Sequence, residues 1–197
     1  MAEQLFNKET FENISSLEIE KIFSEISKAG NVIASLSNPE VYKNGIVNKY
    51  KQSIINVDFN EIVVTPFIKT NTNNEVWIEY VVPFTGNGNL LLLNSMSRRM
   101  PKVEIDATIS NSDFSYEIFT GYHNSITLTD DIKRQMNQRL IGIKEYVEKE
   151  IELLNAKVNE YNESLSKIVS DNFDVCKAKI DERNKTSDDL NPFKKKQ

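Results

Sequence analysis

The last third of the chain carries its most regular pattern of hydrophobic and polar positions. Apolar residues recur there every three or four positions, the spacing that lines one face of an α-helix. Thr129 can cap the beginning of such a helix, and Asp130 and Asp131 suit the positive end of its dipole. The pattern predicts an amphipathic helix over residues 129–186. Its apolar positions are Ile132, Met136, Leu140, Ile143, Val147, Ile151, Leu154, Val158, Tyr161, Leu165 and Ile168.

A stripe of this length needs other apolar groups to cover it, because helical propensity alone rarely sustains so long a helix. From Val147 to Ile168 the repeat is a regular heptad, which permits a coiled coil. We expect the first half to pack on a sheet and the second half to contact a partner protein or a second copy. Whether the helix is one rod or a hairpin stays open. The predicted partner interface is Val147, Ile151, Leu154, Val158, Tyr161, Leu165 and Ile168.

Residues 60–128 show the alternation of apolar and polar positions that is typical of β-strands. Trp77 falls on the less apolar face of its strand, where it could anchor an interface or be covered by the long helix. The links between strands are short and rich in turn residues, and a parallel crossover needs a dozen residues or more, so an antiparallel five-stranded meander is predicted. The candidate strands are residues 61–69, 76–84, 89–93, 102–109 and 114–120.

The region before residue 57 predicts helices. Ser15 to Glu18 fits a capping box, and Gly30 offers a stop. Pro39 suits the first position of a second helix. The sequence thus predicts an α+β fold. Its predicted parts are a domain of helices and sheet over residues 1–128, the long helix over residues 129–186, and a disordered basic tail over residues 187–197.

The charge is mixed along the chain, with 24 basic and 29 acidic residues and a net charge of −5. A phosphate backbone prefers a concentrated basic face, so this balance argues against nucleic-acid binding. No apolar run reaches the ~18 residues that a membrane span needs. The first residues lack the features of a signal peptide, and Cys176 is alone and cannot close an internal disulfide. We therefore expect a cytoplasmic protein without membrane contact.

Candidate chemistry is sparse. His123 is the only histidine and Cys176 the only cysteine, so a structural zinc set cannot form. Glu148, Glu150 and Glu152 lie two positions apart on the predicted helix, so they point to different faces and are expected to be solvated. We predict a non-enzymatic chain with no catalytic residue, no metal site and no cofactor.

Two loops could contact a ligand. One links two strands and contains two glycines, whose exposed backbone amides could hold an anion; a plain hairpin turn explains it equally. The other is the longest connection in the sheet region and carries two adjacent arginines, which could clamp a phosphate or carboxylate or simply be solvated. The candidate ligand-binding residues are Thr85, Gly86, Asn87, Gly88, Arg98 and Arg99.

Two other functions stay open. A metal-dependent hydrolase or nuclease could use dispersed carboxylates, two of which share a strand face. A nucleic-acid-binding protein would combine the loop arginines with aromatic side chains, against the acidic balance. The carboxylates are Glu61, Glu79, Glu104 and Asp106, and the nucleic-acid contacts would be Arg98, Arg99, Trp77 and Tyr80.

The segment Tyr80-Val81-Val82-Pro83-Phe84-Thr85-Gly86, followed by Leu90-Leu91, resembles part of an uncharacterised bacterial module. That module is similar to the N-terminal regions that precede TIR-like or restriction-endonuclease-like effector domains in bacterial immunity proteins. Over residues 75–190 the resemblance implies a sensor, regulatory or oligomerising module of anti-phage defence that works through a partner. The further matching positions are Pro101, Ile143-Lys144, Tyr161-Asn162, Leu165 and Arg183.

Overall fold

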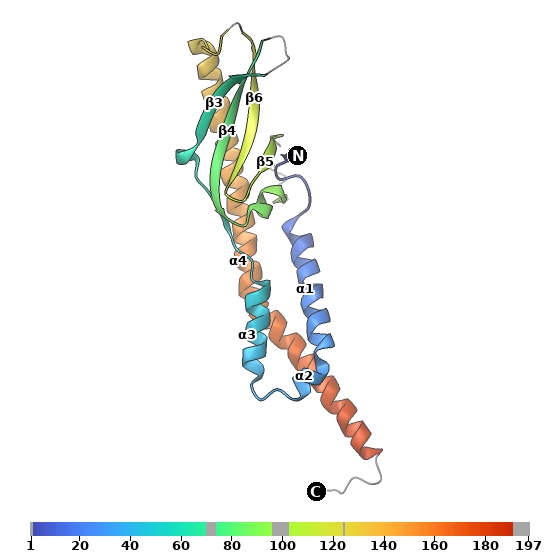
Figure 1. The fold of residues 1–197 in the computed structure, drawn as a ribbon. Helices are drawn as coiled ribbons and strands as arrows, with labels where there is room; N and C mark the ends of the chain where they lie inside the picture. Colours follow the sequence, from blue (N-terminus) through green and yellow to red (C-terminus); the bar gives the residue numbers. More distant parts are fainter. Residues whose placement is uncertain (1, 70–73, 96–102, 124, 191–197) are drawn as a thin grey trace. The chain divides into compact units, whose positions relative to one another are not determined.

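The computed structural model describes residues 2–69, 74–95, 103–123 and 125–190 (Figure 1). The chain has the predicted α+β class. It divides into two compact units. The sheet unit comprises Met1–Phe11 and Ser53–Val158, and the helical unit comprises Glu12–Gln52 and Asn159–Gln197. The expected domain over residues 1–128 differs from this division, because the N-terminal helices group with the second half of the long helix.

The sheet has six strands, all paired antiparallel, in the order β1-β5-β6-β4-β2, with β3 also paired to β4. The prediction of antiparallel pairing is confirmed. The strand bounds are Glu3–Gln4 for β1, Ile55–Val57 for β2, Val63–Ile68 for β3, Glu75–Gly86 for β4, Asp106–Ile109 for β5 and Asp113–Tyr122 for β6.

The expected strand over residues 89–93 does not form, so the strands do not follow one another across the sheet in chain order. Gly88–Leu92 is a short 3₁₀ helix, η2, and a second one, η1, spans Phe59–Glu61. The Asn87 side chain accepts a hydrogen bond from the Asn89 backbone N–H, and this local bond turns the chain away from an extended path. Consequently β4 pairs directly with β6.

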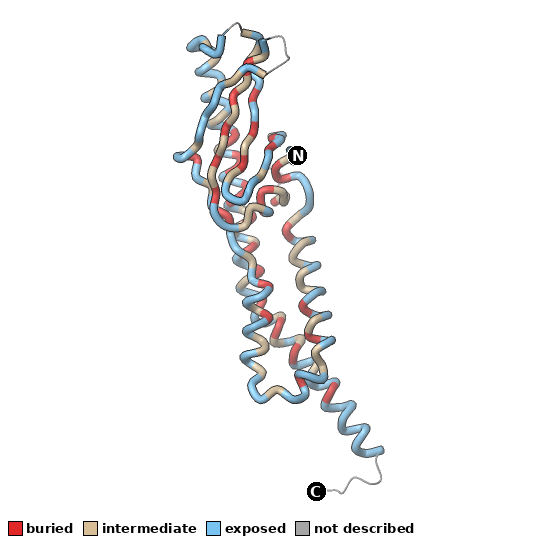
Figure 2. Tube along the Cα trace, viewed as in Figure 1, coloured by how far each residue is buried: buried red, intermediate tan, exposed pale blue. Residues whose placement is uncertain are grey.

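The alternation predicted for β4 is confirmed. Val76, Ile78, Tyr80, Val82 and Phe84 are buried, while the residues between them are partly exposed (Figure 2). These five side chains form the inner face of the sheet, which belongs to the core of the sheet unit.

The long helix α4 spans Asp130–Asp189 without interruption, which confirms the predicted helix and answers the question of rod or hairpin in favour of one continuous helix. The Thr129 hydroxyl accepts from the Ile132 N–H at 3.4 Å, as expected of a cap. Residues 187–189 are helical rather than part of a tail. Leu190 is an exposed turn residue, and residues 191–197 of the predicted basic tail lie outside the described residues.

In the sheet unit, side chains of α4 bind the backbone of the chain that they face. Asn155 accepts from the Ile55 N–H at 3.0 Å and donates to the Ile55 carbonyl at 2.7 Å. Glu150 accepts from the Ser95 N–H at 3.2 Å, and Lys157 donates to the Ser95 carbonyl at 2.8 Å. Glu150 is therefore buried, and the expectation that it would be solvated is wrong.

The helical unit contains most of α1 (Phe11–Lys28), all of α2 (Gly30–Ala34) and α3 (Pro39–Tyr50), and the second half of α4. Pro39 opens α3 as predicted. The capping box at Ser15 is wrong, because α1 already begins at Phe11, and the Ser15 hydroxyl instead donates to the Glu12 carbonyl.

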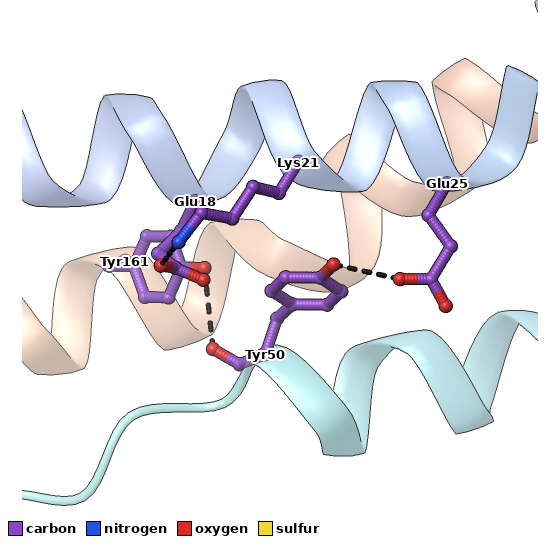
Figure 3. A network of polar contacts seen from close by, with 5 residues as sticks. All are labelled: Glu18, Lys21, Glu25, Tyr50 and Tyr161. Carbon is purple, nitrogen blue, oxygen red and sulfur yellow. Dashed lines mark hydrogen bonds and ion pairs between the residues drawn. The ribbon is translucent and has the colours of Figure 1, made fainter.

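Tyrosine hydroxyls connect the three longer helices of this unit (Figure 3). Tyr50 of α3 donates to the Glu25 carboxylate of α1 at 2.7 Å, and Lys49 pairs with the same carboxylate at 2.6 Å. Tyr161 of α4 donates to the Tyr50 carbonyl at 3.3 Å. Burial, with Glu18 nearby, raises the pKa of Tyr161 to about 12, so this donor keeps its proton across the physiological range.

Candidate functional site

The predicted partner interface along α4 is covered within the chain. Val147, Leu154, Val158 and Leu165 are fully buried, Ile151 and Tyr161 are nearly so, and Ile168 alone of the seven is partly exposed. In this structure six of the seven side chains are thus covered by the chain itself and are not exposed to a partner or a second copy. Its apolar side chains already pack inside the two units, so no coiled-coil partner is needed to cover them.

The predicted ligand-binding residues separate into three groups. Gly86, Asn87 and Gly88 line one pocket of the sheet unit, with a volume of about 450 Å³. Thr85 is exposed beside it and is not part of its lining. Arg98 and Arg99 lie outside the described residues.

Both glycines of this loop are required by close packing. Gly86 has φ +93°, and a Cβ there would lie 1.9 Å from the Ile54 carbonyl oxygen. A Cβ on Gly88 would lie 2.6 Å from the Phe84 ring. The backbone of the loop can approach its neighbours this closely only because neither residue has a side chain.

The outer face of the sheet carries a cluster of aromatic side chains. The ring centroids of Trp77 and Phe119 are 5.3 Å apart, and those of Phe119 and Tyr122 are 5.4 Å apart. Tyr122 is 65% exposed and Phe119 is 38% exposed. The Lys69 ammonium lies 4.1 Å from the centroid of the Trp77 ring, and it pairs with Glu117 at 3.1 Å. We call Trp77, Phe119 and Tyr122 the aromatic cluster; the Trp77 side chain is itself partly exposed.

Strand β3 is an edge strand that exposes apolar side chains on both of its faces. Val63 opposes Val81, so it lies on the outer face, and it is 56% exposed. Val64 and Ile68 oppose Tyr80 and Val76, so they lie on the inner face, yet they are 47% and 40% exposed. The inner side of β3 is therefore not closed off as the inner side of β4 is.

The register of β3 shows which backbone groups face outward. The Lys69 N–H bonds to the Glu75 carbonyl, and these two residues are opposite each other in the register. In an antiparallel pair such bonds recur every second residue. The N–H and C=O groups of Val64 and Ile68 therefore point away from β4. Pro66 lies between them at an outward position, where a missing N–H breaks no bond to β4.

Carboxylates border the aromatic cluster. Glu79 and Glu117 are direct cross-strand neighbours on the outer face, and Glu75 accepts a hydrogen bond from the Trp77 indole N–H at 3.1 Å. Asp106 of β5 also lies on the outer face of the sheet and is exposed. Like charges in directly opposite positions destabilise a sheet, so a cation near Glu79 and Glu117 would stabilise this face.

This surface was only partly evident in the sequence. Trp77 on the less apolar face of its strand was the available signal for the aromatic cluster. For β3, the consecutive Ile62-Val63-Val64 run followed by Pro66 was a usable signal, because proline inside a strand points to an edge. The contribution of Phe119 depends on the register between β4 and β6, which the sequence does not give.

The structure offers little for metal or acid–base chemistry in the described residues. No group of three or more His, Cys, Asp or Glu side chains there could hold a metal ion. The four carboxylates of the hydrolase hypothesis belong to different elements: Glu61 to η1, Glu79 to β4, Asp106 to β5, and Glu104 to the segment before β5.

The remaining titratable candidates have structural contacts. His123 Nε2 lies 3.3 Å from the Thr120 carbonyl oxygen in the sheet unit, and the Cys176 thiol donates to the Ile26 carbonyl at 3.7 Å in the helical unit. Tyr80 and Tyr116 stack on the inner face with centroids 5.2 Å apart. Burial raises the pKa of both phenols, so they stay protonated near neutral pH.

Comparison with known proteins assigns no family: no family model, no curated protein and no solved structure matches this chain. Among the described residues, no helix combines the length and the apolar character that crossing a bilayer requires. The evidence on function therefore comes from the surfaces of the chain itself.

Proposed function

We propose that this chain is a non-enzymatic protein-interaction module that binds its partner through the edge and outer face of its sheet. We call β3 together with the aromatic cluster the docking surface. The observation that carries the proposal is the exposure of apolar side chains on both faces of the edge strand β3.

An open, apolar edge strand is a liability for an isolated protein, because it templates pairing with other chains. A partner segment laid along β3 would bond to the outward backbone groups of Val64 and Ile68 and cover their side chains. Pro66 removes one donor in between, so the added segment must accept a gap in the ladder. This gap limits indiscriminate pairing and favours a partner whose side chains also contact the aromatic cluster.

Charge selects the chemistry of the partner. The outer face combines Glu75, Glu79 and Glu117 with aromatic rings, and Lys69 already occupies the face of Trp77. Lysine or arginine side chains of a partner would pair with these carboxylates and stack on the exposed rings. A second copy docked face to face would instead oppose carboxylates to carboxylates. The partner that fits is thus a basic segment with alternating apolar residues.

This proposal narrows the function inferred from the sequence. The resemblance to N-terminal regions of bacterial immunity proteins adds a context, in which such a module would sense or recruit a partner while another protein carries out the reaction. The surface that we propose for that role is the docking surface of the sheet and not the α4 stripe.

Trp77 provides a direct assay, since it is the only tryptophan in the chain and belongs to the docking surface. Two synthetic peptides serve as probes, one alternating valine and lysine and one alternating valine and glutamate. We expect the basic peptide to shift the Trp77 emission to shorter wavelength, with an affinity that falls as salt is added. The acidic peptide should leave the spectrum unchanged.

Val64→Lys tests the edge, and Ile141→Lys is its matched control, because Ile141 is an equally exposed aliphatic residue of the same unit on α4. Val64→Lys should weaken binding of the basic peptide about tenfold, from lost apolar burial and added repulsion. Equal binding of both peptides, or equal affinities of the two variants, would refute the proposal. Sedimentation could instead show a dimer that forms with rising concentration and is lost in Val64→Lys. That result would identify a second copy of this chain, and not a basic segment, as the partner.

A further inference from the structure

The sheet unit contains a pocket near the ends of β4 and β5. It lies between the loop that follows β4, the turn between β5 and β6, and Glu3 of β1. Its volume of about 450 Å³ falls within the range of small-molecule sites, which begins at roughly 300 Å³. The described residues that line it all belong to the sheet unit: Glu3, Phe84, Gly86, Asn87, Gly88, Asn89, Leu92, Ile109, Ser110 and Asn111.

Hydrogen bonds hold both rims of the pocket in place. On one rim, the Asn87 N–H donates to the Ile54 carbonyl at 3.1 Å, and the Asn87 side chain accepts from the Asn89 N–H at 3.2 Å. On the other rim, the Ser110 hydroxyl accepts from the N–H groups of Ser112 and Asp113 at 3.1 and 3.0 Å. A ligand would therefore meet a preformed site and would not have to order these loops.

Gly88 and Phe84 both line the pocket and pack against each other. The Phe84 ring packs against Gly88 so closely that a Cβ at position 88 would lie 2.6 Å from the ring. Leu92 and Ile109 add apolar side chains to the lining. The lining thus combines apolar side chains with polar groups.

The polar side chains of the rim are asparagine amides, the Ser110 hydroxyl and one carboxylate. Each of Asn89 and Asn111 is exposed and carries a donor and an acceptor on one side chain. Glu3 pairs with Lys8 through Oε2 at 2.7 Å, and a carboxylate has further acceptor sites beyond one such bond. Among the described residues that line the pocket there is no lysine, arginine or histidine. This set disfavours anions, including the anion that the exposed loop amides had suggested.

We infer that this pocket binds a neutral, hydroxyl-rich ligand of the size of a sugar ring. A hydroxyl both donates and accepts, so neighbouring hydroxyls match the paired donor and acceptor of an asparagine amide, and a further hydroxyl can donate to Glu3. The C–H face of such a ring would pack on Leu92 and Ile109, the less buried apolar side chains of the lining. This inference is independent of the proposed docking surface.

Saturation-transfer NMR and calorimetry test the inference on the full chain. The probes are glucose, galactose, mannose and N-acetylglucosamine at millimolar concentration, each also as its methyl glycoside, with inorganic phosphate as the anionic comparison. We expect at least one neutral sugar to bind and phosphate not to bind. Binding of the methyl glycoside would indicate the end of a glycan as the source, whereas binding of the free sugar only would indicate a free monosaccharide.

Variants locate the binding. Asn111→Ala and Asn89→Ala remove exposed side chains and should each weaken sugar binding about tenfold. Asn60→Ala, an exposed asparagine of the same unit outside the pocket, should leave it unchanged, as should Val64→Lys on the docking surface. The inference is overturned if no sugar of the panel shows saturation transfer, if phosphate binds more tightly, or if the pocket variants bind as well as Asn60→Ala.

Discussion

The hydrogen bonds between Asn155 and strand β2 make a quantitative test of how α4 stabilises the sheet unit. Ile55 opposes Gly86, and the adjacent bond from the Asn87 N–H to the Ile54 carbonyl shows that the polar groups of Ile55 point away from β4. Both groups bond instead to the Asn155 side chain, at 3.0 and 2.7 Å. Ile55 is fully buried, so water does not replace these bonds readily.

Asn155→Ala leaves one buried N–H and one buried carbonyl without their partner. Each unpaired group lowers the free energy of unfolding by about 1–3 kcal/mol, and the higher helix propensity of alanine offsets about 0.5 kcal/mol of this loss. The expected loss is about 3 kcal/mol in the free energy of unfolding. With a typical urea dependence of about 2 kcal/mol per molar, the unfolding midpoint should fall by about 1.5 M.

Urea unfolding followed by Trp77 fluorescence measures this loss, because Trp77 belongs to the same unit. Asn159→Ala is the matched control, since Asn159 is an exposed asparagine of the same helix and the substitution brings the same gain in propensity. Midpoints of the two variants within about 0.5 M of each other would refute the idea that Asn155 stabilises β2 by bonding to the polar groups of Ile55.

Three further predictions concern glycine positions and the tyrosine network. Gly142→Ala should stabilise the protein by about 1 kcal/mol in urea unfolding, because Gly142 is helical and a Cβ there meets no atom within 4 Å. Gly86→Ala should destabilise the sheet unit by more than about 4 kcal/mol, read as lost near-ultraviolet circular dichroism, owing to its positive φ and the contact with Ile54. Tyr50→Phe should cost about 1–2 kcal/mol in thermal unfolding at neutral pH. Hydrogen bonds from Lys49 and then Tyr50 lower the pKa of Glu25, so this contribution is present at neutral pH and should disappear as the pH falls through the folded-state pKa.

The sequence predicted the elements with strong periodicity. The spacing in α4 and the alternation in β4 each follow from burying one side of an element, so both could be derived from the order of residues alone. The 3₁₀ turn at Gly88–Leu92 could not, because two consecutive buried leucines fit a strand core as well as a turn. What decided it was the bond from Asn89 to the Asn87 side chain, a local interaction that competes with the strand ladder.

The candidate site was harder to predict because it depends on which apolar surfaces are covered by other parts of the chain. The α4 stripe and the β3 face are both apolar in sequence, and only the packing shows that the first is buried and the second is exposed. The pocket depends on β1, a two-residue strand that brings Glu3 beside β5. Neither a two-residue strand nor its register leaves a signal in the pattern of residues.

The polar side chains beside the α4 stripe explain why a heptad-like repeat need not produce a coiled coil. In the sheet unit, Asn155 bonds to both polar groups of Ile55, and Glu150 and Lys157 bond to the two polar groups of Ser95. In the helical unit, Asn162 bonds in the same two-way manner to Gln52, at 2.9 and 2.8 Å.

In a coiled coil the partner helix has no free backbone groups to offer such side chains, since its own turns use them. Extended or irregular chain has these groups in every residue. Where asparagine, glutamate and lysine flank the stripe and bond to extended or irregular chain, as at Ile55, Ser95 and Gln52, it is matched to a neighbour that is not a helix. Asn155 and Asn162 each bind both polar groups of one residue in a non-helical segment, and these bonds help keep this part of the apolar stripe covered by its own chain.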